Sequence, residues 1–137
     1  MNTLEYLKLR KLPSWKFTTI VDKEAFKNVN KIHPLKQKLV REIVFKAKND
    51  KEVKRIIVFG SSTRYDCDIT SDLDICIDWY SPCYDENGVL KPFTRNMRKA
   101  ISSITKGLAD VVNYNYLNDT DIADAVNKGV IVYEHYV

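Results

Sequence analysis

Aspartates are crowded into one short part of this chain. Residues 65–80 contain five of them, and three, Asp72, Asp74 and Asp78, alternate with apolar residues over the segment 72–78. A period of two is typical of a β-strand, so the pattern predicts a strand with one apolar and one acidic face. An ionised carboxylate taken from water costs several kcal/mol unless a cation meets it. A structural core gains nothing from this arrangement, which therefore indicates a site.

The chemistry of that site follows from the spacing of its residues. Asp72 and Asp74 are two apart on a strand, so their carboxylates project from the same face and can share a cation. Mg²⁺ takes one or two protein carboxylates and completes its coordination with water and substrate phosphates. Residues 54–59 read as a strand that ends in the turn Gly-Ser-Ser-Thr at 60–63, whose N–H groups and hydroxyls suit an anion. We expect the two strands to be adjacent and antiparallel, which brings the turn and the aspartates to one edge.

The remaining elements predict an α+β fold. Apolar residues recur at helical spacing from Pro34 to Ala47. The other expected elements are a helix capped by Thr94 with Leu108 at the end of its buried stripe, a strand over 109–114, a helix from about Asp119 to Lys128, and a terminal strand or extended tail after Gly129. This order predicts a small mixed β-sheet with helices packed mainly on one face. A chain of 137 residues fits one domain, in which residues 1–30 form an irregular N-terminal extension.

Composition excludes several classes of protein. No apolar run approaches the length of a membrane span or a signal peptide, which indicates a cytoplasmic protein without a membrane partner. Three cysteines without CxxC spacing argue against a disulfide framework and a structural zinc site; Cys67 is the one thiol for which reactivity is considered. Residues 1–60 carry 15 Lys and Arg against 6 Asp and Glu. These cations are dispersed and not interleaved with aromatic residues, so nucleic-acid binding is an alternative that is not favoured.

The residues of the turn and the acidic strand together resemble a known family. Gly60-Ser61, ten intervening residues and Asp72-Leu73-Asp74 look like the GS…DxD signature of the polymerase-β-like nucleotidyltransferase superfamily, in its minimal type. The resemblance implies a palm-like fold with a catalytic core over 54–116. Tyr65 departs from the family, which often has glycine there.

The resemblance also implies the roles of individual residues. Asp72 and Asp74 would ligate two Mg²⁺ ions, and Asp110 would join one metal and help to deprotonate the acceptor. The residues that would hold the triphosphate of ATP or another NTP are Gly60, Ser61, Ser62 and Arg64. For Arg64, an ion pair with the neighbouring acids is the alternative.

The function implied by the resemblance is transfer of a nucleoside monophosphate, with AMP from ATP as the first candidate, to an acceptor hydroxyl. Small members of the family often serve as antitoxins that adenylylate a helical partner of the HEPN type, and this chain is of similar size. Two alternatives remain: a non-catalytic module that senses a nucleotide or docks a partner, and a transferase that modifies a small molecule of the aminoglycoside type.

Overall fold

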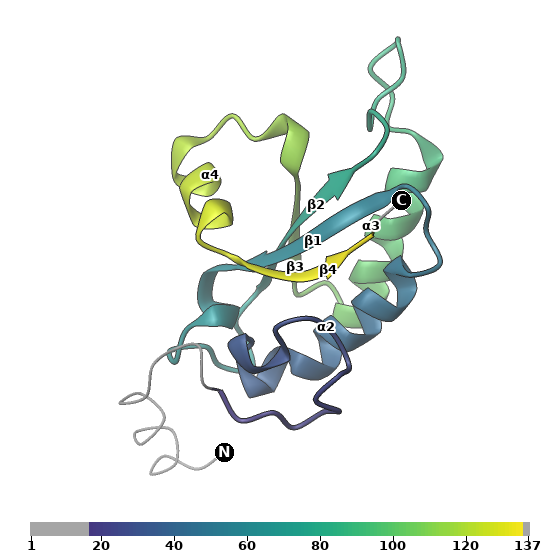
Figure 1. The fold of residues 1–137 in the computed structure, drawn as a ribbon. Helices are drawn as coiled ribbons and strands as arrows, with labels where there is room; N and C mark the ends of the chain where they lie inside the picture. The colour runs from purple at the N-terminus through teal and green to yellow at the C-terminus, as the bar shows by residue number, and fades with distance from the viewer. Residues whose placement is uncertain (1–16, 136–137) are drawn as a thin grey trace.

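A four-stranded mixed sheet forms the centre of the fold (Figure 1), seen in a computed structural model that describes residues 17–135. Its strands are β1 (Val53–Phe59), β2 (Leu73–Trp79), β3 (Ala109–Asn113) and β4 (Val130–Glu134). The order is β3-β2-β1-β4, with β2 antiparallel to β1 and parallel to β3, and β4 antiparallel to β1. The adjacent, antiparallel arrangement expected for the first two strands is therefore confirmed.

Within residues 17–135, three α-helices cover this sheet. They are α2 (Pro34–Ala47), α3 (Pro92–Thr105) and α4 (Thr120–Asn127). The two longer helices lie side by side on one face and enclose the main core, whereas α4 covers part of the other face around Phe59 and Cys76 (Figure 1). The predicted α+β class, with helices mainly on one face, is confirmed. None of the helices within residues 17–135 is long and apolar enough to cross a membrane.

The starts of the helices agree with the sequence prediction at α2 and, within one residue, at α4 but differ from it at α3. Pro34 is the first residue of α2, as the sequence predicts, and α4 begins at Thr120, one residue after the predicted start, with Asp119 as its N-cap. The prediction that Thr94 caps α3 is wrong, because that helix begins at Pro92 and Thr94 is fully buried within its first turn. Proline at the first helical position needs no hydrogen-bond partner for its nitrogen, and this favours the earlier start.

Polar contacts attach the segment before α2 to the body of the protein. Residues 17–28 contain turns and no helix or strand, and the buried side chain of Gln37 holds them in place. Its amide nitrogen donates to the carbonyl of Thr18, and its oxygen accepts from the Ile20 N–H. Residues 1–16 of the predicted N-terminal extension lie outside the described residues.

The second face of β2 is not the exposed acidic face that the alternation predicts. Asp78 is buried and forms an ion pair with Arg55, directly opposite it in β1, at 3.0 Å. The Arg55 guanidinium also lies 4.6 Å from the centre of the Tyr114 ring. The charge of Asp78 is therefore neutralised within the fold, which leaves Asp72 and Asp74 as the acidic residues of this segment that need another explanation.

The three cysteines are free thiols in the interior, with exposures of 2% for Cys67 and 0% for Cys76 and Cys83. Burial raises the pKa of each, that of Cys76 to about 12. We therefore expect iodoacetamide to label none of them in the native protein at mildly alkaline pH and all three after denaturation, as followed by mass spectrometry. Rapid labelling of native Cys67 would contradict this expectation and would mean that Cys67 is a reactive thiol.

Candidate active site

Three neighbouring strands place the candidate site in one row. Phe59 of β1 is the register partner of Asp74 in β2, and Asp74 is the partner of Asp110 in β3. Directly opposed residues in a sheet project from the same face, so the two aspartate side chains stand side by side. Asp72 lies two residues before Asp74 and is exposed, as is Asp110. The carboxyl-bearing end of this face is therefore open to solvent.

Gly60 completes the row and limits the space around Asp74. It has a φ of +73°, a conformation that suits glycine, and a Cβ built on it would overlap Oδ2 of Asp74. The backbone of the turn thus lies directly against the carboxylate. Sequence spacing predicted this meeting of the glycine turn with the acidic strand, and the structure brings the two together.

The electrostatics of this corner are unfavourable for an isolated protein. Burial raises the pKa of the Asp74 carboxyl above its usual range, and the charges of Asp110 and Asp72 raise it further. Arg64 acts in the opposite direction but does not cancel these effects. Like-charged carboxylates held together in this way are stabilised by a cation that binds between them.

A Mg²⁺ ion at this corner would need ligands beyond the protein side chains. Within residues 17–135, no group of three or more His, Cys, Asp or Glu side chains could hold a metal ion. Mg²⁺ needs only one or two protein carboxylates when phosphate oxygens and water supply its other ligands. The adjacent Asp74 and Asp110, with a glycine backbone beside them, fit an ion that arrives with a nucleotide.

The turn after β1 is a short 3₁₀ helix, η2 (Gly60–Thr63). The Thr63 hydroxyl donates to the carbonyl of Gly60 at 2.8 Å and closes the turn. Ser61 is half-buried beside Gly60, whereas Ser62 points inward, is fully buried and has an Oγ without a hydrogen-bond partner. The Ser62 hydroxyl therefore lies away from the position expected for a phosphate contact.

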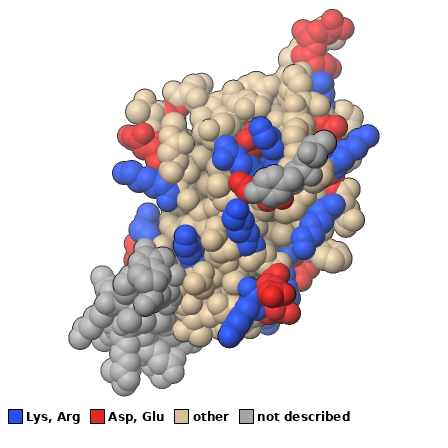
Figure 2. Space-filling model, in the orientation of Figure 1, with Lys and Arg blue, Asp and Glu red and all other residues tan. Residues whose placement is uncertain are grey.

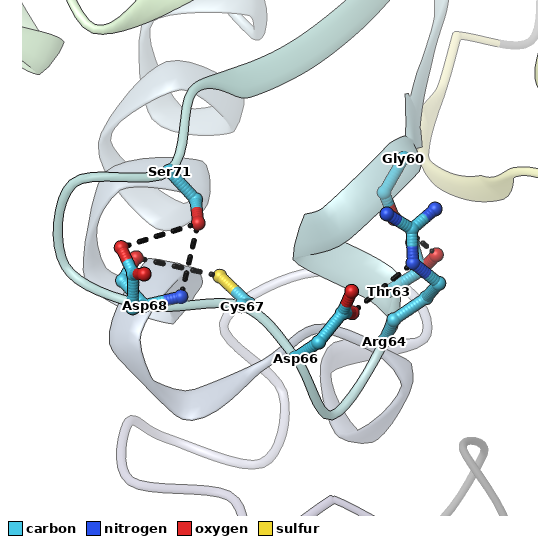
Figure 3. Close-up of polar contacts among 7 residues, drawn as sticks. All are labelled: Gly60, Thr63, Arg64, Asp66, Cys67, Asp68 and Ser71. Carbon is cyan, nitrogen blue, oxygen red and sulfur yellow. Dashed lines mark hydrogen bonds and ion pairs between the residues drawn. The ribbon is translucent and has the colours of Figure 1, made fainter.

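The loop that follows the turn contains the remaining charged residues (Figure 3). Arg64 and Asp66 form an ion pair at 3.1 Å in which both side chains are mostly exposed, with exposures of 59% and 61%. Exposed pairs of this kind contribute little stability, roughly 0 to 1 kcal/mol. The Asp68 carboxylate accepts hydrogen bonds from Thr70 and Ser71 and shapes the loop. The Arg64 guanidinium is thus paired with Asp66 and still accessible to solvent.

A groove of about 340 Å³ runs between α3 and β3 and borders Asp110. Its polar lining includes Arg98, Lys99 and Ser102. Elsewhere, the Lys and Arg side chains on the face drawn in Figure 2 are dispersed among uncharged residues. The groove therefore reaches a predicted site residue.

Sequence reasoning missed the residues of α2 that contact the loop. Lys36 is 2% exposed and donates from Nζ to the Ser71 carbonyl, and the His33 N–H donates to the Ser62 carbonyl. The signal was present in the helical periodicity: Lys36 stands one turn before Val40, on the buried side, whereas Leu35 is 41% exposed.

Comparison with known proteins agrees with this geometry. Residues 41–136 match the model of the family described as polymerase beta, nucleotidyltransferase, and the chain belongs to this family. The chain is therefore a nucleotidyltransferase by family, and the resemblance inferred from its sequence is confirmed. None of the curated proteins searched matches it.

A solved structure shows the same fold in another protein. One similar structure is a toxin–antitoxin complex with AMP-PNP, with a TM-score of 0.51, 16% identity, and coverage of 72% of this chain and 73% of that one. Another is the toxin–antitoxin MntA-HepT, with a TM-score of 0.45, 16% identity, and coverage of 74% of this chain and 71% of that one. At this identity the first comparison establishes the fold alone.

Proposed function

We propose that this nucleotidyltransferase moves a nucleoside monophosphate, with ATP as the first candidate donor, to an acceptor hydroxyl in a Mg²⁺-dependent reaction. The observation that carries the proposal is the position of Asp74, which stands beside Asp110 in the neighbouring strand and against the backbone of Gly60. Crowded carboxylates next to a glycine turn suit a metal-bound triphosphate. The raised pKa of Asp74 supports the same assignment.

The proposed roles divide among the three aspartates. Asp72 and Asp74 would hold two Mg²⁺ ions once a nucleotide supplies phosphate ligands, and Asp110 would be a further ligand of one of them. Bound there, the metal would supply electrostatic stabilisation of the charge that develops on the phosphate oxygens. The acceptor oxygen forms a bond to the α-phosphorus while the bond to pyrophosphate breaks and pyrophosphate leaves with the electron pair. Asp110, exposed at the edge of the sheet, accepts the proton of the acceptor hydroxyl.

The turn and its neighbouring arginine hold the phosphates in this proposal. Gly60 and Ser61 offer backbone N–H groups, and the Ser61 hydroxyl adds a donor. Ser62 contributes through its backbone, because its side chain is buried. Arg64 contacts the triphosphate by exchanging its exposed partner Asp66 for a phosphate oxygen, which is a stronger, charge-assisted contact.

We infer that the acceptor approaches along the groove between α3 and β3, whose lining includes Asp110. A HEPN-type helical protein is the first acceptor to test, because the same fold occurs in a toxin–antitoxin complex with AMP-PNP. A small molecule of the aminoglycoside type is the second. Both acceptor classes present a hydroxyl, so they are distinguished by which of them receives the nucleotide.

A labelling experiment tests the proposal. The protein is incubated with each of the four α-³²P-labelled NTPs, Mg²⁺ and candidate acceptors, which include HEPN-type proteins encoded beside its gene and a panel of aminoglycosides. We expect label to move from ATP to one acceptor class, with release of pyrophosphate, and EDTA to abolish the transfer. The Asp72→Asn variant should lose transfer as well, and Asp124→Asn on the exposed surface of α4 serves as the charge-matched control.

The contrary results are equally specific. Mg²⁺-dependent ATP binding without transfer to any acceptor would indicate a nucleotide-sensing module instead of an enzyme. Transfer that persists in EDTA or in Asp72→Asn would overturn the metal-dependent mechanism.

A further inference from the structure

The charged side chain of Lys36 is buried, although the core does not need a charge at this position. It lies in the first turn of α2, is 2% exposed, and its Nζ donates to the carbonyl of Ser71 at 2.5 Å. Removing an ammonium from water costs several kcal/mol, and an apolar residue of similar length would fill the same space without that cost. The position of its hydrogen-bond partner, Ser71, indicates what the buried lysine contributes.

Ser71 is the residue immediately before Asp72, so the contact fixes the backbone at the start of the acidic strand. The N-cap residue of α2 holds the other end of the loop, because the His33 N–H donates to the Ser62 carbonyl at 2.8 Å. The N-cap and the first turn of α2 therefore hold both ends of residues 62–71, which join the glycine turn to the aspartates.

Other contacts within this loop do not replace that grip. The Arg64–Asp66 pair is mostly exposed, and so is the hydrogen bond of Asp68 with Ser71 (Figure 3). The hydrogen bond of Asp68 with Thr70 is exposed as well. They shape the loop but tie it to no other element. The hydrogen bond of Lys36 with Ser71 connects the end next to Asp72 with the helical layer.

We propose that Lys36 is a positioning residue for the metal–nucleotide site: it holds the Ser71 carbonyl so that Asp72 starts from a fixed backbone when the metal-bound triphosphate binds. The inference rests on the proposed function. A loop released at this end would lower the affinity for a metal–nucleotide complex more than it lowers the stability of the fold, because the site needs its ligands preorganised.

The test compares three variants. Lys36→Met keeps the length of the side chain and removes the donor, Lys36→Arg retains charge and donors, and Lys38→Met makes the same change at an exposed position of α2. Binding of Mn²⁺ is measured by electron paramagnetic resonance in the presence of a non-transferable ATP analogue, and amide hydrogen exchange is measured across residues 66–72.

We expect Lys36→Met to weaken Mn²⁺ binding in the presence of the analogue by about tenfold, in the range by which partners that orient metal ligands act. Exchange across 66–72 should rise in the same variant. Lys36→Arg should recover most of the affinity, and Lys38→Met should match the wild type. If Lys36→Met does not fold, Lys36→Gln, which lacks the charge and whose amide nitrogen lies one bond closer to the backbone than the lysine Nζ and so withdraws from the Ser71 carbonyl, takes its place.

Affinity for Mn²⁺ that equals the wild-type value in a folded Lys36→Met or Lys36→Gln protein would overturn the inference, even with faster exchange, because the role would then be structural. Absence of Mn²⁺ binding by the wild type with the analogue would overturn the proposed function, and the inference with it. The two failures are therefore distinguished by the wild-type measurement.

Discussion

The Asp74→Asn variant is expected to lose nucleotidyl transfer by more than about 100-fold and, without metal, to unfold at a higher temperature than the wild type. The loss of activity follows from its proposed place as a metal ligand, since even partners that only orient such ligands account for 10- to 100-fold. The gain in stability follows from the surroundings of the carboxylate, where burial and the charges of Asp110 and Asp72 disfavour ionisation.

The sign of the stability effect is set by the direction of the pKa shift. A carboxyl whose pKa is raised in the folded protein favours folding in its protonated form, and that contribution is lost as pH rises through the raised pKa. At neutral pH the ionised Asp74 therefore costs stability, and a neutral amide of the same shape does not. The difference between the variant and the wild type should grow from acidic to neutral pH.

Thermal unfolding in EDTA, at several pH values, measures this effect. Adding Mg²⁺ and a non-transferable ATP analogue should reverse the order, because the ligand stabilises only the protein that binds it. Asp124→Asn on the exposed surface of α4 is the control for loss of one charge, and we expect it to change neither property. An Asp74→Asn protein that unfolds at a lower temperature in EDTA would mean that the carboxylate makes a stabilising contact of its own.

The outline of the site was predictable because its elements are local. The strand into Gly60 and the alternation around Asp74 are local patterns, and strands that follow one another along the chain usually lie next to each other in the sheet. The pairing of Asp74 with Asp110 is not local, since these residues lie on parallel strands separated by α3. Here the family resemblance, and not periodicity, identified the third carboxylate.

Other details depended on partners that are distant in sequence. Asp78 was expected on an acidic face, yet Arg55 stands opposite it and permits its burial. Lys36 and Gln37 occupy the buried side of α2, where helical spacing predicts apolar residues, because backbone carbonyls of Ser71 and Thr18 accept their hydrogen bonds. A single sequence does not reveal which polar residues find such acceptors, and burial of a polar group depends on them.

The Gly60→Ala variant is expected to lose both stability and activity, and Gly88→Ala separates the two causes. Both glycines have a left-handed backbone, with φ of +73° and +77°, so each alanine carries a backbone cost of about 1 to 2 kcal/mol. Around Gly88 there is open space, whereas a methyl group at position 60 would overlap Oδ2 of Asp74. The difference between the variants therefore measures the contact with the carboxylate.

We expect Gly88→Ala to lose only the backbone cost in urea unfolding and to transfer nucleotide at the wild-type rate. Gly60→Ala should lose more stability, and its transfer should fall by more than about 100-fold, because the displaced carboxylate no longer meets the metal. Replacing Asp74 by alanine removes the overlapping atom, so the extra cost of Gly60→Ala should disappear in the double variant. Equal costs in both backgrounds would show that the turn and the carboxylate are independent, and the site proposed here requires them to be in contact.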